Sequence, residues 1–116
     1  MEVGPGVYSS SSLPETWERD SDPPGEVHIL CADAEMQSGL WRPFAGLTPD
    51  PVRWTLPARE TILVLEGRGR IEIEGGPTLE LKPGAIASLP GGATTTWHIT
   101  PDFKEFWVLG EQVTES

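Results

Sequence analysis

At 116 residues, the chain is long enough for one hydrophobic core but not for two, so we expect a single domain. Eighteen acidic residues against eight basic ones give a formal net charge of -10 at pH 7, which argues against nucleic acid and against an anionic membrane as partners, because both require a basic surface. The single cysteine, Cys31, cannot form an internal disulfide, and the N-terminus lacks the basic start and apolar run of a signal peptide, so we expect a cytoplasmic protein.

Residues 1–25 are rich in Ser, Pro and Gly, so they offer little to bury and are expected to form an irregular N-terminal arm. Its apolar residues, Val7, Tyr8, Leu13 and Trp17, could lie across the domain or contact a second subunit. Three strands are expected next, at residues 26–32, 38–44 and 52–56.

The centre of the chain holds strand-like runs separated by glycine turns. Glu60 opens the aliphatic run 61–65, which lacks alternation and therefore predicts a strand buried on both faces. Residues 70–74 instead alternate charged and apolar side chains, so Ile71 and Ile73 are expected to face a core. Short strands without a helix-length periodic segment predict an all-β sandwich or barrel. Further strands are expected at residues 78–81, 85–89, 94–99 and 103–109, followed by a polar C-terminal tail at 111–116.

Two spacings in this central part resemble those of a known family. Glu60 is followed after six residues by Gly67, and Gly84 is followed after five residues by Pro90-Gly91-Gly92. These spacings resemble the second half of the first cupin motif and the start of the second. The chain is also similar to the small single-domain cupins of the RmlC-like superfamily that group with the (S)-ureidoglycine aminohydrolase cupin domain and the ethanolamine-utilisation cupin, through Gly39-Leu40-Trp41, Trp97 and Lys104.

The resemblance implies a double-stranded β-helix, which is a jelly-roll barrel open at one end, over residues 26–110. Alternation along the strands predicts the same all-β class independently. Because cupins of this group usually dimerise, the resemblance also implies a homodimer. An open barrel in an acidic protein suits a small organic ligand rather than nucleic acid or a membrane.

The sequence departs from the family where a metal would bind. A metal-binding cupin carries a His-X-His pair shortly before the glutamate and a third histidine after Pro-X-Gly. Of these ligands only Glu60 remains, and one carboxylate does not hold a divalent metal in a water-exposed pocket, so we expect no metal and no other cofactor. The positions where histidine is expected are occupied by Arg53 and Thr55 or by Trp54 and Leu56, depending on the spacing, and by Thr95.

His98 is the remaining candidate for a metal-binding histidine near the motifs. Strand residues alternate between faces, so an inward Thr95 and Trp97 would turn His98 outward unless a bulge intervenes. His28 lies on an early strand, far from the motifs in sequence.

The predicted pocket contains Glu60 and Lys104 as candidate catalytic residues. Burial raises the pKa of a carboxyl group and a nearby ammonium lowers it, so a tuned Glu and Lys could exchange protons with a substrate without a metal. The two residues could instead form a structural ion pair, and the tryptophans could be core or dimer aromatics. Tryptophans in a pocket can stack on a planar ligand or bind a cation. The candidate ligand-binding residues are Trp41, Arg53, Trp54, Thr95 and Trp97.

Three functional hypotheses follow. The first is a binding protein that holds a small organic ligand in the barrel. The second is a metal-independent isomerase, lyase or cyclase with Glu60 as the acid/base residue. The third keeps a metal through Glu60 and His98, as a hydrolase resembling ureidoglycine aminohydrolase would require. The sequence contains no nucleophile elbow and no phosphate-binding loop, which removes the commoner enzyme classes.

Overall fold

The computed structural model describes residues 1–44, 48–49 and 51–110, and within these ranges it contains strands but no helix. The prediction of an all-β fold is therefore confirmed, and every strand expected between residues 26 and 109 forms within two residues of its expected ends. The described residues hold no helix of the length and apolarity that a membrane span needs. The strands are β1 (Glu2–Gly4), β2 (Val7–Tyr8), β3 (Glu18–Ser21), β4 (Pro24–Ala32), β5 (Gln37–Arg42), β6 (Val52–Thr55), β7 (Glu60–Glu66), β8 (Gly69–Ile73), β9 (Thr78–Leu81), β10 (Ile86–Leu89), β11 (Thr94–Ile99) and β12 (Lys104–Leu109).

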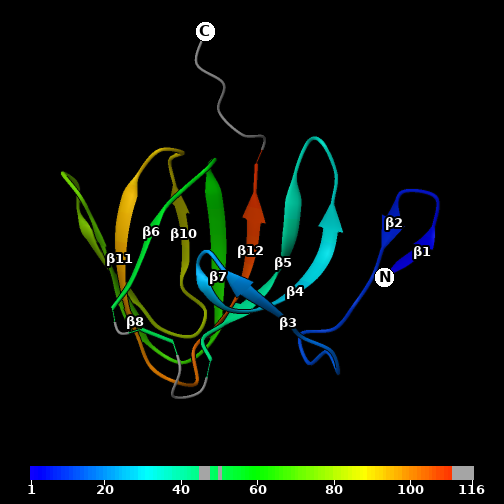
Figure 1. Cartoon of the computed structure of the whole chain (residues 1–116), viewed down its shortest axis with the longest axis horizontal. Helices are drawn as coiled ribbons and strands as arrows, with labels where there is room; N and C mark the ends of the chain where they lie inside the picture. Colours follow the sequence, from blue (N-terminus) through cyan, green and yellow to red (C-terminus); the bar gives the residue numbers. More distant parts are fainter. Residues whose placement is uncertain (45–47, 50, 111–116) are drawn as a thin grey trace, which may run out of the picture.

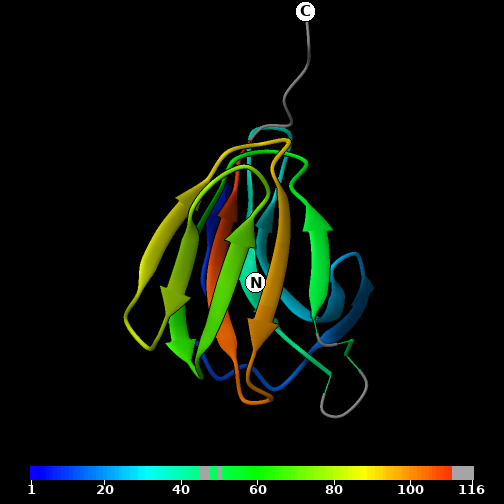
Figure 2. The ribbon, with the colours of Figure 1, turned by 90° about the vertical axis from the view of Figure 1, so that its left-hand side faces the viewer.

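Two antiparallel sheets make up the body of the molecule. One has six strands in the order β10-β7-β12-β5-β4-β3, and the other has four in the order β6-β11-β8-β9. Figures 1 and 2 show the two sheets facing each other across a common interior. Strands from distant parts of the chain lie side by side, since β12 pairs with both β5 and β7. The sheets thus bring residues from both ends of the sequence to one interior.

The core lies between the sheets and contains the inward side chains of alternating strand positions. On β7, Ile62 and Val64 are buried, whereas Thr61 is exposed and Leu63 is only half-buried. The prediction that this strand is buried on both faces is therefore wrong, because one face packs on the core and the other lies on the outside of the six-stranded sheet. Residues 62–65 are all aliphatic, so the sequence does not show which of them point inward and which outward. The buried cluster comprises Val27, Trp41, Val52, Leu56, Ile62, Val64, Ile71, Leu81, Leu89, Trp97, Phe103 and Trp107.

The turn between β7 and β8 requires glycine at position 67. Gly67 has φ of 80°, in the region that side chains rarely adopt. A Cβ at this position would also lie 2.5 Å from the Cα of Phe103. The family spacing from Glu60 to Gly67 thus has a physical basis, because the turn packs against the loop that carries a core aromatic residue.

The first 25 residues contain more regular structure than the irregular arm we expected. β1 and β2 form a small hairpin, and β3 pairs with β4 as the outermost strand of the six-stranded sheet. β3 has the sequence Glu18-Arg19-Asp20-Ser21, which does not suggest a strand, but charged side chains are common on exposed sheet edges. Figure 1 shows the β1–β2 hairpin standing apart from the two sheets. The predicted tail at 111–116 lies outside the described residues.

Candidate functional site

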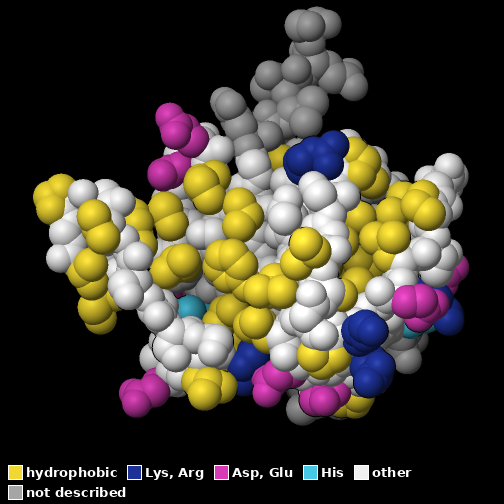
Figure 3. All heavy atoms as spheres, turned by 180° about the vertical axis from the view of Figure 1, so that it is seen from behind, with side chains coloured by type: hydrophobic (Ala, Val, Ile, Leu, Met, Phe, Trp, Pro, Cys, Tyr) yellow, Lys and Arg dark blue, Asp and Glu magenta, His cyan; other side chains and the backbone are white. Residues whose placement is uncertain are grey.

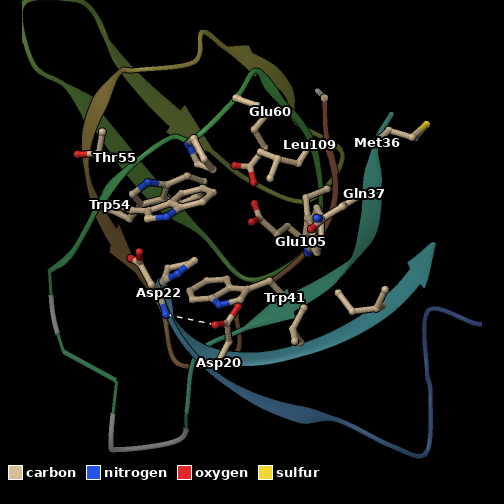
Figure 4. A pocket seen from close by; sticks show the side chains of 18 of the residues that line it. Asp20, Asp22, Met36, Gln37, Trp41, Trp54, Thr55, Glu60, Glu105 and Leu109 are labelled. Atoms are coloured by element: carbon tan, nitrogen blue, oxygen red, sulfur yellow. Dashed lines mark hydrogen bonds between the residues drawn. The ribbon is translucent and has the colours of Figure 1, made fainter. Parts of the chain in front are cut away.

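A cavity of about 490 Å³ lies between the sheets, within the size range of ligand pockets, roughly 300–1,000 Å³. Its walls come from β4, β5, β7 and β12 of the six-stranded sheet and from β6 and β11 of the other. Figure 4 shows the side chains that line it. The described lining residues include four tryptophans, Trp41, Trp54, Trp97 and Trp107, and two buried acidic residues, Glu60 and Glu105.

Glu60 and Glu105 reach the cavity from neighbouring strands. Glu60 is the first residue of β7 and pairs with Leu109, whereas Glu105 is near the start of β12 and pairs with Val64. Both positions are on the inward face, and the two side chains point toward one another across the cavity (Figure 4). Glu60 is 3% exposed and Glu105 is 4% exposed. Two carboxyl groups therefore meet inside an otherwise largely apolar interior.

The carboxyl pair lacks the hydrogen bonds that burial normally demands. Glu60 Oε1 and Glu105 Oε2 are buried and have no hydrogen-bond partner in the described part of the chain. Burial raises the pKa of Glu60 to about 8. Burial and then the neighbouring Glu60 raise the pKa of Glu105 well above its usual range. At neutral pH Glu60 thus favours the protonated form, which is the state of a general acid rather than of a fixed anion.

The tryptophans are held in place by the core. The ring of Phe103 lies edge-on to Trp41, with centroids 6.2 Å apart, and to Trp97, with centroids 6.4 Å apart. Gly25 lies against Trp41, and a Cβ there would be 2.5 Å from its Nε1 atom. Trp54 is only half-buried and lines the cavity from β6. Packing therefore fixes the positions of the Trp41 and Trp97 indole groups that line the cavity.

Lys104 does not join Glu60 in the cavity, contrary to the pairing expected from the sequence. Its Nζ atom donates to Ser12 O at 2.7 Å and forms an ion pair with Glu66 Oε2 at 2.9 Å. The reason is the alternation of a strand: Glu105 faces inward, so its neighbour Lys104 faces outward. Neither the proposed acid–base pair of Glu60 with Lys104 nor its structural ion pair forms, and the inward partner of Glu60 is Glu105.

Two of the other predicted ligand-binding residues do not line the cavity. Arg53 is exposed because Val52 and Trp54 take the inward positions of β6. Thr95 is fully buried, and its hydroxyl donates to Trp54 O at 2.7 Å and accepts from Trp97 Nε1 at 2.8 Å. Thr95 therefore holds the indole group of Trp97 and the backbone of Trp54 rather than facing the cavity. Trp41, Trp54 and Trp97 line the cavity as expected.

The donor atoms near the cavity do not fit the metal that the fold family implies. Within the described residues, no three His, Cys, Asp or Glu side chains are grouped so that they could hold a metal ion. His98 lies outside the cavity and contacts the carboxylate of Glu72. His28 is bonded to Ser10 Oγ at 2.6 Å and to the carbonyl of Thr16 at 3.1 Å. Two carboxyl groups without an imidazole are a poor donor set for a transition metal.

Further acidic residues lie along the lining. Asp20 lies on β3 and Asp22 in the turn that follows it, and Asp33 and Glu35 come from the β4–β5 connection. Asp33 Oδ1 accepts hydrogen bonds from the backbone N–H groups of Glu35 at 2.8 Å and Met36 at 3.0 Å, and these bonds lower the pKa of Asp33. None of the described lining residues is Lys, Arg or His. The cavity is therefore acidic, as the net charge of the chain allows.

Sequence reasoning missed Glu105, Trp107 and the acidic residues contributed by β3 and the turn after it. No decisive signal for Glu105 existed in the sequence, because both faces of β12 carry apolar residues, Trp107 and Leu109 on its own face and Phe106 and Val108 on the other. No signal existed for Asp20 and Asp22 either, which lie in a stretch without strand character and reach the cavity only because β3 pairs with β4.

The family model described as the EutQ-like cupin domain matches residues 33–105. No curated protein matches the chain in sequence. Among solved structures, the putative ethanolamine utilization protein Q of Salmonella typhimurium is similar, with a TM-score of 0.65 and 20% identity over 84% of this chain and 80% of that one. The EutQ protein of Clostridium difficile has a TM-score of 0.63 and 16% identity over 80% of this chain and 66% of that one.

A cupin-family protein of Methanocaldococcus jannaschii is described as RmlC-like with a double-stranded β-helix fold. It has a TM-score of 0.61 and 13% identity over 91% of this chain and 90% of that one. At such identities these structures show the fold alone, and they confirm the predicted double-stranded β-helix. The finer grouping with the (S)-ureidoglycine aminohydrolase cupin domain stays a prediction, since the matched family model is named for the ethanolamine-utilisation protein.

Proposed function

The chain belongs to the EutQ-like cupin domain family, and from the cavity inside its barrel we propose that it binds a small organic molecule there. The observation that carries this proposal is a pair of buried carboxyl oxygens without a hydrogen-bond partner, Glu60 Oε1 and Glu105 Oε2, on two residues that line the cavity. An unpaired buried polar group costs about 1–3 kcal/mol, and an apolar pair of similar size would avoid that cost. A ligand that bonds to these oxygens is a physical reason to keep them.

Four of the five tryptophans offer a direct test, because they line the cavity and the fifth does not. Trp17 lies outside it, where the guanidinium of Arg42 stacks over its ring at 4.0 Å. In a nitrogen–proton correlation spectrum each indole N–H gives one signal, which single Trp→Phe variants assign. A ligand in the cavity should shift several of the four signals and leave that of Trp17 in place. A shift confined to Trp17 would contradict the proposal.

An acid–base enzyme is the second candidate, and the raised pKa of Glu60, about 8, favours it. A carboxyl group that titrates near neutral pH can both donate and accept a proton, so Glu60 could serve an isomerase, lyase or cyclase without a metal. Glu105 takes the place of Lys104 as its neighbour. In D2O, an enzyme should exchange a carbon-bound proton of the bound ligand, and Glu60→Gln should stop the exchange while binding persists. A binding protein would show no exchange in either form.

A metal-dependent hydrolase resembling ureidoglycine aminohydrolase has less support. Glu60 is the one residue at an expected metal-ligand position, and His98 contacts Glu72 on the outer side of the four-stranded sheet. The proposed binding function therefore needs no protein-bound metal.

We also propose that the protein forms a homodimer through its N-terminal region. Val3, Val7 and Leu13 are 60%, 55% and 74% exposed, and large apolar side chains in such positions often mark contacts with another chain. Figure 3 shows hydrophobic side chains on the projecting hairpin, at the left of that view, and on the neighbouring face. A second copy of the chain would cover them.

A further inference from the structure

We propose that the cavity selects a positively charged organic molecule, a small amine or quaternary ammonium ion, held between the indole groups and the Glu60–Glu105 pair. This inference rests on the proposed binding function and adds the charge of the ligand. It is argued from the charges of the lining, the unpartnered oxygens and the aromatic walls.

The charges of the lining residues argue against an anionic ligand. An anionic ligand would need a cationic side chain, and none of the described lining residues is Lys, Arg or His. Asp20, Asp22, Asp33 and Glu35 instead add carboxylates to the lining. Like charges so close together repel an anion and raise the local concentration of cations. Of the two basic residues expected in the pocket from the sequence, Lys104 bonds to Ser12 and Glu66 on the other face of β12, and Arg53 is exposed.

The unpartnered carboxyl oxygens favour a ligand that carries hydrogen-bond donors. Glu60 and Glu105 line the cavity, and their buried atoms Glu60 Oε1 and Glu105 Oε2 accept no hydrogen bond within the described residues. An ammonium group carries up to three N–H donors, so one group could bond to both carboxyls, and charge-assisted bonds of this kind are about twice as strong as neutral ones. The pair therefore offers acceptor groups to an organic cation.

The aromatic walls suit the rest of such a ligand. Figure 4 shows the carboxyl groups of Glu60 and Glu105 with Trp54 to one side and Trp41 below them. A cation within about 6 Å of an indole face is attracted by the negative face of the ring, and the attraction grows when water is excluded. Trp41 and Trp97 are 4% and 3% exposed, so the walls are well shielded from water.

The test compares probes that differ in charge but not in shape. Choline is compared with its neutral carbon analogue 3,3-dimethyl-1-butanol, and benzylammonium with benzoate, by following the indole N–H signals during titration. Choline should bind at least about tenfold more tightly than the alcohol, and benzylammonium should bind while benzoate does not. Glu105→Gln should weaken benzylammonium about tenfold, should weaken choline less because its nitrogen carries no N–H donor, and should leave the alcohol unchanged. Glu74→Gln, which removes the same charge from an exposed turn, should change none of these affinities.

The outcomes separate this inference from the proposed function. Equal affinities for choline and the alcohol, or tighter binding of benzoate, would overturn the cation inference while leaving a binding cavity. No shift of the four cavity signals with any probe would overturn the cation inference and count against the binding function too. Should Glu105→Gln fail to fold, Glu60→Gln serves in its place, and the comparison of probes on the native chain decides in either case.

Discussion

Replacing Glu60 with Gln should stabilise the protein at alkaline pH, because an ionised carboxylate inside the barrel is costly. Gln has nearly the same shape and cannot ionise. Glu60 Oε1 has no hydrogen-bond partner in the described residues, so the substitution loses no bond at that atom. It also removes the repulsion that Glu60 exerts on Glu105.

The sign and size of the effect follow from the pKa of Glu60, which burial raises from 4.5 to about 8. A carboxyl group with a raised pKa holds its proton more tightly in the folded chain than in the unfolded one. Its stabilising contribution is therefore complete below the unfolded value and is lost as the pH rises toward the folded value. The shift corresponds to roughly 5 kcal/mol, at about 1.4 kcal/mol for each pH unit. That is a large fraction of the 5–15 kcal/mol by which domains are typically stable.

Urea unfolding, followed by tryptophan fluorescence between about pH 5 and about pH 9, measures this effect. The free energy of unfolding of the native chain should fall relative to that of Glu60→Gln as the pH rises, by several kcal/mol over the range. The exposed control Glu74→Gln should run parallel to the native chain. A difference between the native chain and Glu60→Gln that stays constant with pH would refute the reasoning, because it would mean that Glu60 titrates alike in both states.

Three further predictions concern the packing around Trp41, dimer formation and the metal content of the protein. Gly25→Ala should cost about 1–3 kcal/mol of stability and shift the indole signal of Trp41, because its Cβ would lie 2.5 Å from Trp41 Nε1. Gly4→Ala, which meets nothing within 4 Å, is the control, and equal melting temperatures for the two variants would contradict this account. Sedimentation equilibrium should show a dimer that the double change Val3→Asp and Val7→Asp converts to a monomer; a native monomer would end the dimer proposal. Elemental analysis of protein purified without a tag or chelator should find far less than one transition-metal ion per chain, and near-stoichiometric manganese, iron, nickel or zinc would contradict metal independence.

Much of the fold could be predicted from local patterns. Alternation in residues 70–74 correctly turned Ile71 toward the core, and glycine turns bounded most of the strands. The spacing from Glu60 to Gly67 indicated the cupin fold because it reflects a local turn that only glycine adopts easily. The weakest expectation was for residues 1–25, where β3 is a strand only because β4 offers it a partner.

The site was predicted in part. Glu60, Trp41, Trp54 and Trp97 line the cavity, as their positions in the motifs suggested. The partner of Glu60 was the main difference, since the resemblance suggested Lys104 and the structure brings Glu105 to it.

What the sequence determined by itself was the set of strands and, for most of them, the side chains that share a face, because both depend on neighbours one to four residues away. It could not determine which of two adjacent charged residues on β12 faces inward, since neither a buried Glu nor a buried Lys is expected from its chemistry alone. Pairing of β12 with β5 and β7 decided that question, by setting a register in which Trp107 and Leu109 fill the interior and carry Glu105 with them. The acidic cavity is thus a product of tertiary structure, because its two buried carboxyl groups are 45 residues apart in sequence and meet only when their strands pair.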